Sequence, residues 1–160
     1  MHRNTDTVGL EPLTEGNLAL LLDAAVAEAH PLEVMPPIAG APGWNAERRR
    51  AFLEFHRGRA LADQPVEYTY VITVGGRVVG AARLQPGEAG LEAGVWIGRS
   101  DRGRGVGGVV AERLRAIAAE IGARRIVAVT TVGNTAARRL LGAANSTVDG
   151  DTVTATVALE

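Results

Sequence analysis

Cysteine and lysine, two residue types that often carry chemistry, are both missing from the 160-residue sequence. Without cysteine the chain forms no disulfide, offers no thiolate to a metal and has no cysteine nucleophile. All 17 basic residues are arginine. This excludes reactions that need a Schiff-base lysine or the lysine of an ATP-binding P-loop. Any reaction must therefore proceed without a cysteine thiol or a lysine amine.

Long hydrophobic runs and a large excess of one charge are also missing. No stretch approaches the roughly 20 apolar residues of a membrane span, and no apolar run follows a basic N-terminus. The formal net charge is -1, so there is no global basic field of the kind that accompanies nucleic-acid binding. We expect a cytoplasmic protein that binds neither nucleic acid nor membrane, built as one domain over residues 1–160.

Hydrophobic periodicity and turn residues predict the order of the elements as β-α-α-β-β-β-α-β-α-β-β. The strands are expected over residues 8–11, 67–74, 77–84, 91–98, 125–131 and 152–159, with one more before the turn at Asp149-Gly150. Helices are expected over about 14–29 and 45–61, then up to Gly122, and again from about Asn134. Four prolines and two glycines make residues 31–43 an irregular connection.

The segment after the strand at residues 91–98 is the most informative one. Four glycines occur within six positions, at Gly103, Gly105, Gly107 and Gly108. They allow backbone dihedrals closed to other residues and remove the Cβ atoms that would keep an anion away. A helix follows directly, and its first N–H groups have no partner inside the helix and lie at the positive end of its dipole. This arrangement predicts a binding site for a pyrophosphate.

Two different roles for the loop fit the sequence less well. The pattern Gly103-x-Gly105-x-x-Gly108 also satisfies the dinucleotide-binding fingerprint of oxidoreductases. However, four polar residues separate the strand from the first glycine, and no acid that could bind a ribose ends the next strand at residues 129–131. The strands before the loop also form hairpins rather than alternating with helices. A purely structural turn would need only one glycine.

With these features the chain resembles the GCN5-related N-acetyltransferase (GNAT) family. The family's acetyl-CoA motif, Gln/Arg-x-x-Gly-x-Gly/Ala between the fourth strand and the third helix, stands here as Arg102-Gly103-Arg104-Gly105-Val106-Gly107. The resemblance covers most of the chain in element order. It implies an α/β (α+β) fold with a mixed, mostly antiparallel sheet that is splayed between strands 4 and 5 and flanked by helices.

The resemblance implies acetyl-CoA as cosubstrate. Main-chain groups of Trp96, Ile97, Gly98 and Arg99 would pair with the pantetheine arm, and Asn134, just beyond the fifth strand, would touch it. The residues expected around the pyrophosphate are Arg102, Gly103, Arg104, Gly105, Val106, Gly107 and Gly108. The two arginines would add charge to the hydrogen bonds of the loop.

In this family the acetyl group passes directly from the thioester to an amine. Glu92 is the best candidate for a general base, acting directly or through water. It shares a strand face with Gly94 and Trp96, and it is equally compatible with an ordinary glutamate on the sheet. The family often has a tyrosine seven residues after the asparagine, but this chain has Leu141. That departure keeps a second interpretation open, an acyl-CoA-binding protein without catalytic activity.

The acceptor is less defined than the donor. We expect a primary amine of a small molecule or of a protein N-terminus, selected by the first two helices and their connection between His30 and Trp44. The three histidines are far apart and lack metal-ligand spacing, so we expect no metal. An exposed C-terminal strand would allow a homodimer.

Overall fold

A computed structural model of the chain describes residues 7–88, 90–131, 145–149 and 152–159. The strands are β1 (Val8–Pro12), β2 (Tyr68–Val74), β3 (Arg77–Gly87), β4 (Gly90–Ile97), β5 (Arg125–Thr131), β6 (Asn145–Asp149) and β7 (Thr152–Ala158). The helices are α1 (Glu15–Glu28), α2 (Pro31–Val34), α3 (Ala46–Ala60) and α4 (Val106–Ile121), and a 3-10 turn, η2, spans Arg99–Asp101. All the predicted strands are present. The helix expected from about Asn134 lies outside the described residues.

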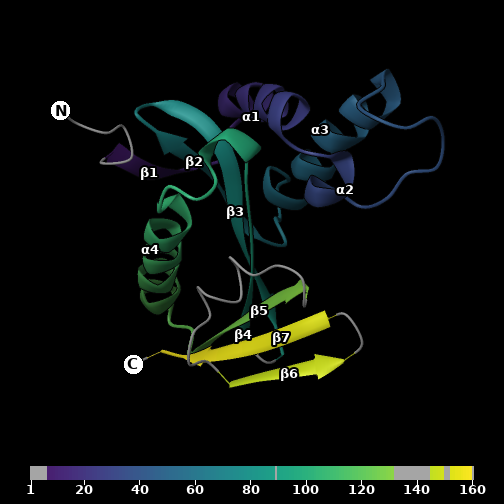
Figure 1. The fold of residues 1–160 in the computed structure, drawn as a ribbon. Coiled ribbons are helices and arrows are strands. Elements are labelled where there is room, and N and C mark those ends of the chain that lie inside the picture. The colour runs from purple at the N-terminus through teal and green to yellow at the C-terminus, as the bar shows by residue number, and fades with distance from the viewer. Residues whose placement is uncertain (1–6, 89, 132–144, 150–151, 160) are drawn as a thin grey trace.

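The strands form one seven-stranded sheet in the order β1-β2-β3-β4-β5-β7-β6. Strands β4 and β5 pair in parallel, whereas the other described pairs are antiparallel. The parallel pairing covers three positions, Leu91 to Ala93 against Ile126 to Ala128, although both strands continue beyond them. The mixed, mostly antiparallel sheet that parts between its fourth and fifth strands is thereby confirmed (Figure 1).

Helices cover both faces of the sheet (Figure 1). Val71, Ala81 and Trp96 pack in the cluster that contains α1 and α3 side chains, with Phe52 of α3 fully buried there. The residues that alternate with them pack against α4 in a second cluster, which includes Ile72, Ala82, Leu84, Val110 and Leu114. Because successive strand residues face opposite sides, Glu92 and Gly94 lie on the same side as Trp96, toward α1 and α3.

Turns and helix ends agree with the local sequence. Gly75 and Gly76 have φ angles of +59° and +82° in the β2–β3 hairpin, the conformation that a two-residue turn with both angles positive requires. The side chain of Thr14 accepts from the N–H of Asn17 at the start of α1, and Asn45 accepts from Arg48 at the start of α3. Gly122 ends α4 with a φ of +98°. These caps confirm the predicted helix ends.

The short helix α2 falls inside the connection that the sequence predicts to be irregular. His30 caps it by accepting the N–H of Leu32 on Nδ1 at 3.2 Å, and Glu33 accepts the N–H of His30 at 3.0 Å. Pro31 stands at the first helical position, where its missing N–H costs nothing. A single helical turn therefore forms through local side-chain contacts, without the periodic apolar stripe of a longer helix.

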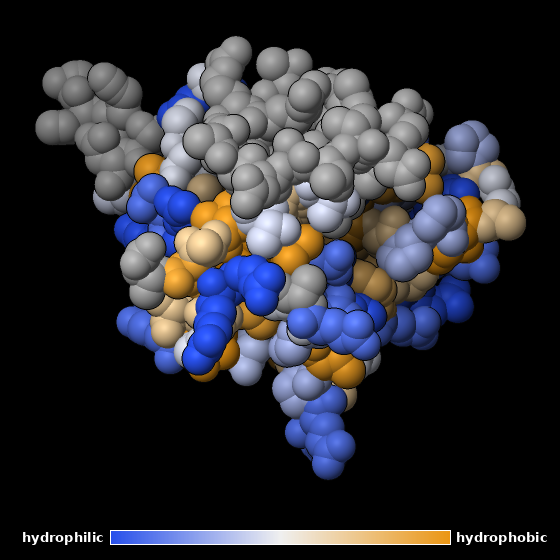
Figure 2. Space-filling model, turned by 90° about the horizontal axis from the view of Figure 1, so that it is seen from below, coloured by the Kyte–Doolittle hydropathy of each residue, from blue (hydrophilic) through white to orange (hydrophobic). Residues whose placement is uncertain are grey.

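The surface mixes polar and apolar residues. Seen from below the view of Figure 1, hydrophilic and hydrophobic groups adjoin one another across the coloured part of the face (Figure 2). In the described part of the chain, no helix has the length and apolar character needed to cross a membrane.

Candidate functional site

The glycine-rich loop between β4 and α4 has an open outer side. Gly103 and Gly105 have φ angles of +74° and +84°, a region that strongly favours glycine. A Cβ built on either residue would meet no described atom within 4 Å. Backbone conformation, not crowding, therefore requires glycine at both positions, and no described atom occupies the space beside them.

The start of α4 is suited to an anion. Gly105 is the N-cap residue, and among the described residues no side chain caps this end of the helix. Val106 in the first turn is buried and fixes the helix start against the core. The first N–H groups of a helix lack intrahelical partners and carry its positive dipole end. The loop and the helix start together therefore fit a phosphate or pyrophosphate group.

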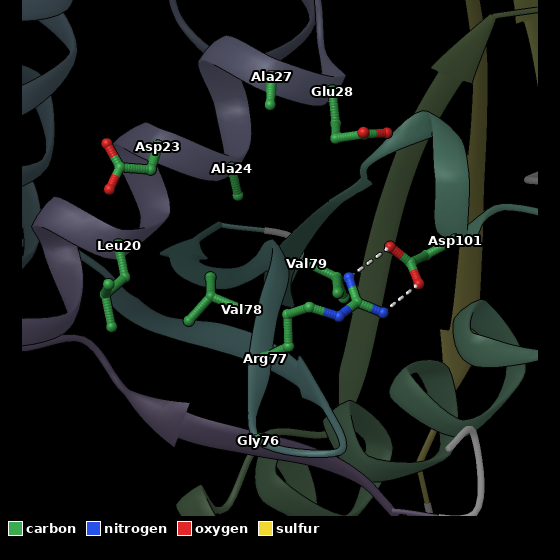
Figure 3. Close-up of a pocket in the computed structure, with 10 residues that line it drawn as sticks. All are labelled: Leu20, Asp23, Ala24, Ala27, Glu28, Gly76, Arg77, Val78, Val79 and Asp101. Carbon is green, nitrogen blue, oxygen red and sulfur yellow. Dashed lines mark hydrogen bonds and ion pairs between the residues drawn. The ribbon is translucent and has the colours of Figure 1, made fainter. Parts of the chain in front are cut away.

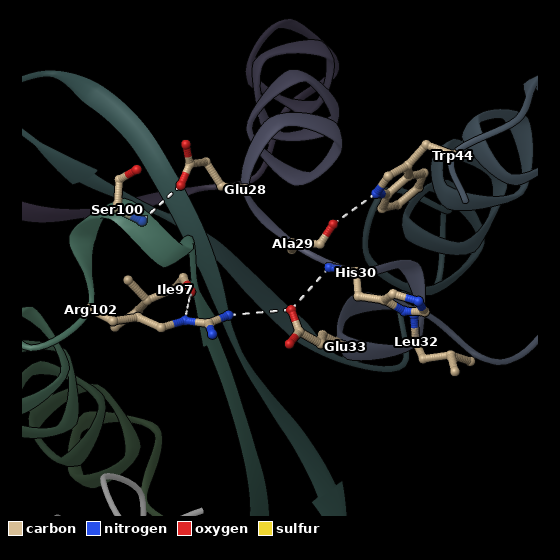
Figure 4. Close-up of polar contacts among 9 residues, drawn as sticks. All are labelled: Glu28, Ala29, His30, Leu32, Glu33, Trp44, Ile97, Ser100 and Arg102. Carbon is tan, nitrogen blue, oxygen red and sulfur yellow. Dashed lines mark hydrogen bonds and ion pairs between the residues drawn. The ribbon is translucent and has the colours of Figure 1, made fainter. Parts of the chain in front are cut away.

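The turn η2 is held in place from two sides. Glu28, at the end of α1, accepts the N–H of Ser100 at 2.7 Å (Figure 4), and hydrogen bonds from Ser100 lower the pKa of Glu28. Arg77 donates to both carboxylate oxygens of the buried Asp101 at 3.1 and 3.3 Å (Figure 3). These three charged side chains also line a pocket of about 400 Å³ between α1 and the β2–β3 hairpin. The contacts of Ser100 and Asp101 with Glu28 and Arg77 thus hold the segment that leads into the glycine-rich loop.

Arg102 contacts β4 and α2 in this structure. Its Nε donates to the carbonyl of Ile97 at 2.7 Å, and its Nη2 donates to Glu33 at 3.3 Å (Figure 4). Burial alone would raise the pKa of Glu33, but the His30 N–H and Arg102 outweigh that effect and lower it. Arg104 is exposed. The phosphate-binding role of both arginines stays a prediction, and for Arg102 it competes with the Glu33 ion pair.

The residues predicted to contact pantetheine lie in the part of β4 that follows the parallel pairing and in the turn after it. Trp96 and Ile97 pair with Ala81 and Gly80 of β3. A Cβ on Gly80 would lie 2.1 Å from the Trp96 carbonyl oxygen, so only glycine allows this approach. On its other edge, β4 has no described strand partner beyond Ala93. The main-chain groups predicted to bind the pantetheine arm belong to Trp96 and Ile97 on this strand and to Gly98 and Arg99 directly after it.

Glu92 is exposed and pairs, through its backbone position, with Gln85 of β3 and Val127 of β5. Within the described residues its carboxylate makes no ion pair. This position is compatible with proton transfer through water and also with a plain surface glutamate. Asn134 and Leu141 lie outside the described residues, so their roles remain as predicted from the sequence.

A buried ionic cluster on the α3 side of the sheet was not predicted. Glu67 is 4% exposed, and its Oε1 accepts from Arg59 at 2.8 Å and from Arg83 at 3.0 Å. Its Oε2 accepts from the Thr69 hydroxyl at 2.7 Å. Burial alone would raise the pKa of Glu67, but Thr69 and the two arginines outweigh it and lower that pKa.

His56 lies beside this cluster and is also buried. Its two ring nitrogens make no hydrogen bond in the described structure, and the ring packs edge-on against Phe52 and Phe55. Burial lowers the pKa of His56 to about 4, with Glu67 opposing and the two arginines assisting that shift. His56 is therefore neutral near pH 7. Among the described residues, no group of three His, Asp or Glu side chains is placed to hold a metal ion.

The loop, the helix start and the parting strands agree with a comparison to known families. The model of the acetyltransferase (GNAT) family matches residues 23–143. This chain belongs to the GNAT family. It is accordingly an acetyl-CoA-dependent acyltransferase, and the dinucleotide-binding alternative is wrong.

Solved structures share this fold at low sequence identity. Mycobacterium smegmatis RimJ in complex with CoA-disulfide is 21% identical, with a TM-score of 0.71 over 94% of this chain and 81% of its own. Salmonella typhimurium yncA with its cofactor acetyl-CoA is 18% identical, with a TM-score of 0.66 over 96% and 94%. Mutant forms of the Vibrio cholerae spermidine/spermine N-acetyltransferase SpeG are 14% identical, with a TM-score of 0.68 over 96% of this chain and 94% of their own. No curated protein matches the sequence.

Proposed function

We propose that this GNAT protein transfers the acetyl group of acetyl-CoA to a primary amine of a small molecule or of a protein N-terminus by direct attack. The observation that carries the proposal is the start of α4, which no described side chain caps, following the part of β4 that continues beyond its pairing with β5. A ligand with a pyrophosphate at one end and an extended arm fits that combination.

Different residues would bind the cofactor and transfer the proton. Backbone amides of residues 103–108 would hold the pyrophosphate, while main-chain groups from Trp96 to Arg99 and the side chain of Asn134 would hold the arm. In the reaction the amine nitrogen bonds to the thioester carbonyl carbon, and the C–S bond breaks to release the thiolate of coenzyme A. The protein then has to orient both reactants and accept one proton from the nitrogen.

Glu92 is our candidate for accepting that proton. It lies at the second of the three paired positions of β4 and β5, one residue before the pairing ends. Because its side chain is exposed, a water molecule would relay the proton to the carboxylate. With Leu141 in place of the family tyrosine, we expect the thiolate to leave without a tyrosine acid and to take its proton from solvent.

The test combines binding with turnover. Acetyl-CoA should raise the melting temperature of the protein, and a screen of amines of several classes should reveal thiol release with at least one. A protein that acetyl-CoA stabilises but that releases no thiol with any amine would be the catalytically inactive acyl-CoA-binding protein instead. No stabilisation by acetyl-CoA would contradict the assignment of the loop.

The role of Glu92 is tested by Glu92→Gln. We expect turnover to fall roughly 100-fold, the lower end of the range for general bases, with the thermal shift from acetyl-CoA retained. Glu88→Gln is the matched control, because Glu88 is an exposed glutamate in the turn before β4. Unchanged turnover of Glu92→Gln at several pH values would remove Glu92 as the base.

A further inference from the structure

The ionic cluster of Arg59, Glu67 and Arg83 lies close to the candidate base. Arg83 of β3 pairs with Gly94 of β4, and a Cβ on Gly94 would lie 3.2 Å from the Arg83 Nε. The guanidinium therefore extends over β4, in the space that the missing side chain leaves open. Glu92 and Gly94 share one strand face, and two strand residues span about 7 Å. Arg83 and Glu92 are thus neighbours on the α3 side of the sheet.

The cluster of Arg59, Glu67 and Arg83 has a net charge of +1. Two arginines share one carboxylate, and His56 beside them is neutral near pH 7. Glu67 uses only the Nε of Arg59 and one terminal nitrogen of Arg83, although each guanidinium has five N–H donors. In the described residues neither arginine has a second carboxylate partner.

The two arginines of the cluster are partly exposed to solvent, whereas the carboxylate between them is not. The Glu67 side chain is fully buried, whereas those of Arg59 and Arg83 are 29% and 38% exposed. Phe55 supports both guanidinium groups from one side, with ring centroids 5.4 and 5.9 Å away. A buried carboxylate and an aromatic ring thus hold two arginines in fixed positions, with donors that no described residue uses, a geometry that suits an incoming carboxylate.

We propose that the acceptor amine carries a carboxylate, and that Arg83, positioned by Glu67 and assisted by Arg59, binds that carboxylate while the amine lies near Glu92. This inference rests on the proposed function. The spacing selects a flexible amino acid whose amine and carboxylate are roughly 5–8 Å apart, since the two binding groups lie about two strand residues apart. The same positive charge opposes binding of a diamine.

Matched acceptors test the proposal by steady-state thiol release. The acids are 4-aminobutyrate, 5-aminopentanoate and 6-aminohexanoate, compared with their amides and with diamines of equal length. We expect a KM at least 10-fold lower for the best acid than for its amide or diamine. Arg83→Gln should remove that difference by raising KM for the acid more than KM for the amide. Arg83→Lys should restore part of the difference, because it keeps the charge without the guanidinium fork.

Two further variants separate binding from folding. Gly94→Ala keeps every charge, but its methyl group would press on the Arg83 side chain, which would have to shift by a few tenths of an ångström, and it should also raise KM for the acids. Arg57→Gln on the same helix as Arg59 is the control, since Arg57 pairs with exposed Glu15, and it should change nothing. Equal KM values for acid and amide, a preference for the diamine, or equal losses for acid and amide in Arg83→Gln would each overturn the inference.

A binding measurement distinguishes this inference from the proposed function. In the presence of CoA, 6-aminohexanoate should raise the melting temperature of the parent protein and of Arg57→Gln but not of Arg83→Gln. If that pattern holds without thiol release from any amine, the transfer reaction is wrong and the carboxylate site stands. If thiol release occurs with amines but none of the three acids shifts the melting temperature, the carboxylate site is wrong and the transfer reaction stands.

Discussion

The glycine-rich loop at residues 103–108 takes its shape from the backbone, whereas the connection between α1 and α3 at residues 29–45 takes its shape largely from side chains. In the loop, Gly103 and Gly105 adopt positive φ angles and face open space. In the connection, side chains bond back to main-chain carbonyls. The Trp44 indole donates to Ala29 at 2.9 Å (Figure 4), and Arg48 donates to Ile38 and Gly43 at 2.7 and 2.9 Å.

This difference fits what each region has to recognise. A pyrophosphate is the same in every molecule of acetyl-CoA, and backbone amides at a helix start can bind it without any particular side chain. An acceptor differs from enzyme to enzyme, so its recognition depends on side chains that can be exchanged. Experiments that perturb the two regions should therefore give different kinds of defect.

The largest effect is expected from Gly105→Glu in the loop. The substitution forces a side chain into a φ of +84° and places a carboxylate where the phosphate would lie. A saturating ligand at 100 times its Kd stabilises a protein by about 2.7 kcal/mol, and this variant should lose all of that stabilisation by acetyl-CoA in a thermal melt.

The control for this variant is Gly58→Glu. Gly58 lies in α3, where a Cβ would also meet no described atom within 4 Å, but it is remote from the loop in sequence and is not at a helix start. It should retain the full shift with acetyl-CoA. A full shift in Gly105→Glu would show that the loop does not bind the pyrophosphate.

The same contrast explains how much the sequence alone could predict. Requirements of the backbone leave local patterns, so the hairpin at Gly75-Gly76, the caps at Thr14 and Asn45 and the loop glycines were all recognisable. The helix α2 was not recognisable, because four residues are too few to show a repeating hydrophobic pattern. The cluster around Glu67 was not either. Arg83 lies 16 residues away in the sequence and meets Glu67 only through the register of β2, β3 and β4.

A medium effect on the free energy of unfolding is expected from acidification, and it should come from the buried side chains of α3 and its surroundings. His56 has a pKa of about 4 in the folded protein against 6.5 for an ordinary histidine. Between these values the unfolded chain binds a proton that the folded protein does not, so stability falls as the pH decreases from about 6.5 to 4. The loss at pH 5 should be about 2 kcal/mol relative to neutral pH. Glu67, whose pKa is lowered, adds a loss only at more acidic pH.

Urea unfolding at pH 7, 6 and 5 measures this dependence. His56→Leu should flatten it over that range, because the leucine removes the titrating group and fills an apolar site between Phe52 and Phe55. Arg57→Gln, on the exposed side of the same helix, should keep the parent slope. An unchanged slope in His56→Leu would mean that other groups determine the acid sensitivity.

The smallest effect is expected where the two regions meet, at the ion pair of Glu33 and Arg102. Both side chains are about 40–45% exposed, and such pairs contribute about 0–1 kcal/mol, so Glu33→Gln should barely change the melting temperature of the free protein. If Arg102 binds phosphate, releasing it from Glu33 should strengthen acetyl-CoA binding about two- to threefold in a titration calorimeter. Glu47→Gln, an exposed glutamate in the first turn of α3, should leave the affinity unchanged. A weaker affinity in Glu33→Gln would instead show that Glu33 holds Arg102 in its binding position, so that α2 supports the donor site as well as bordering the acceptor.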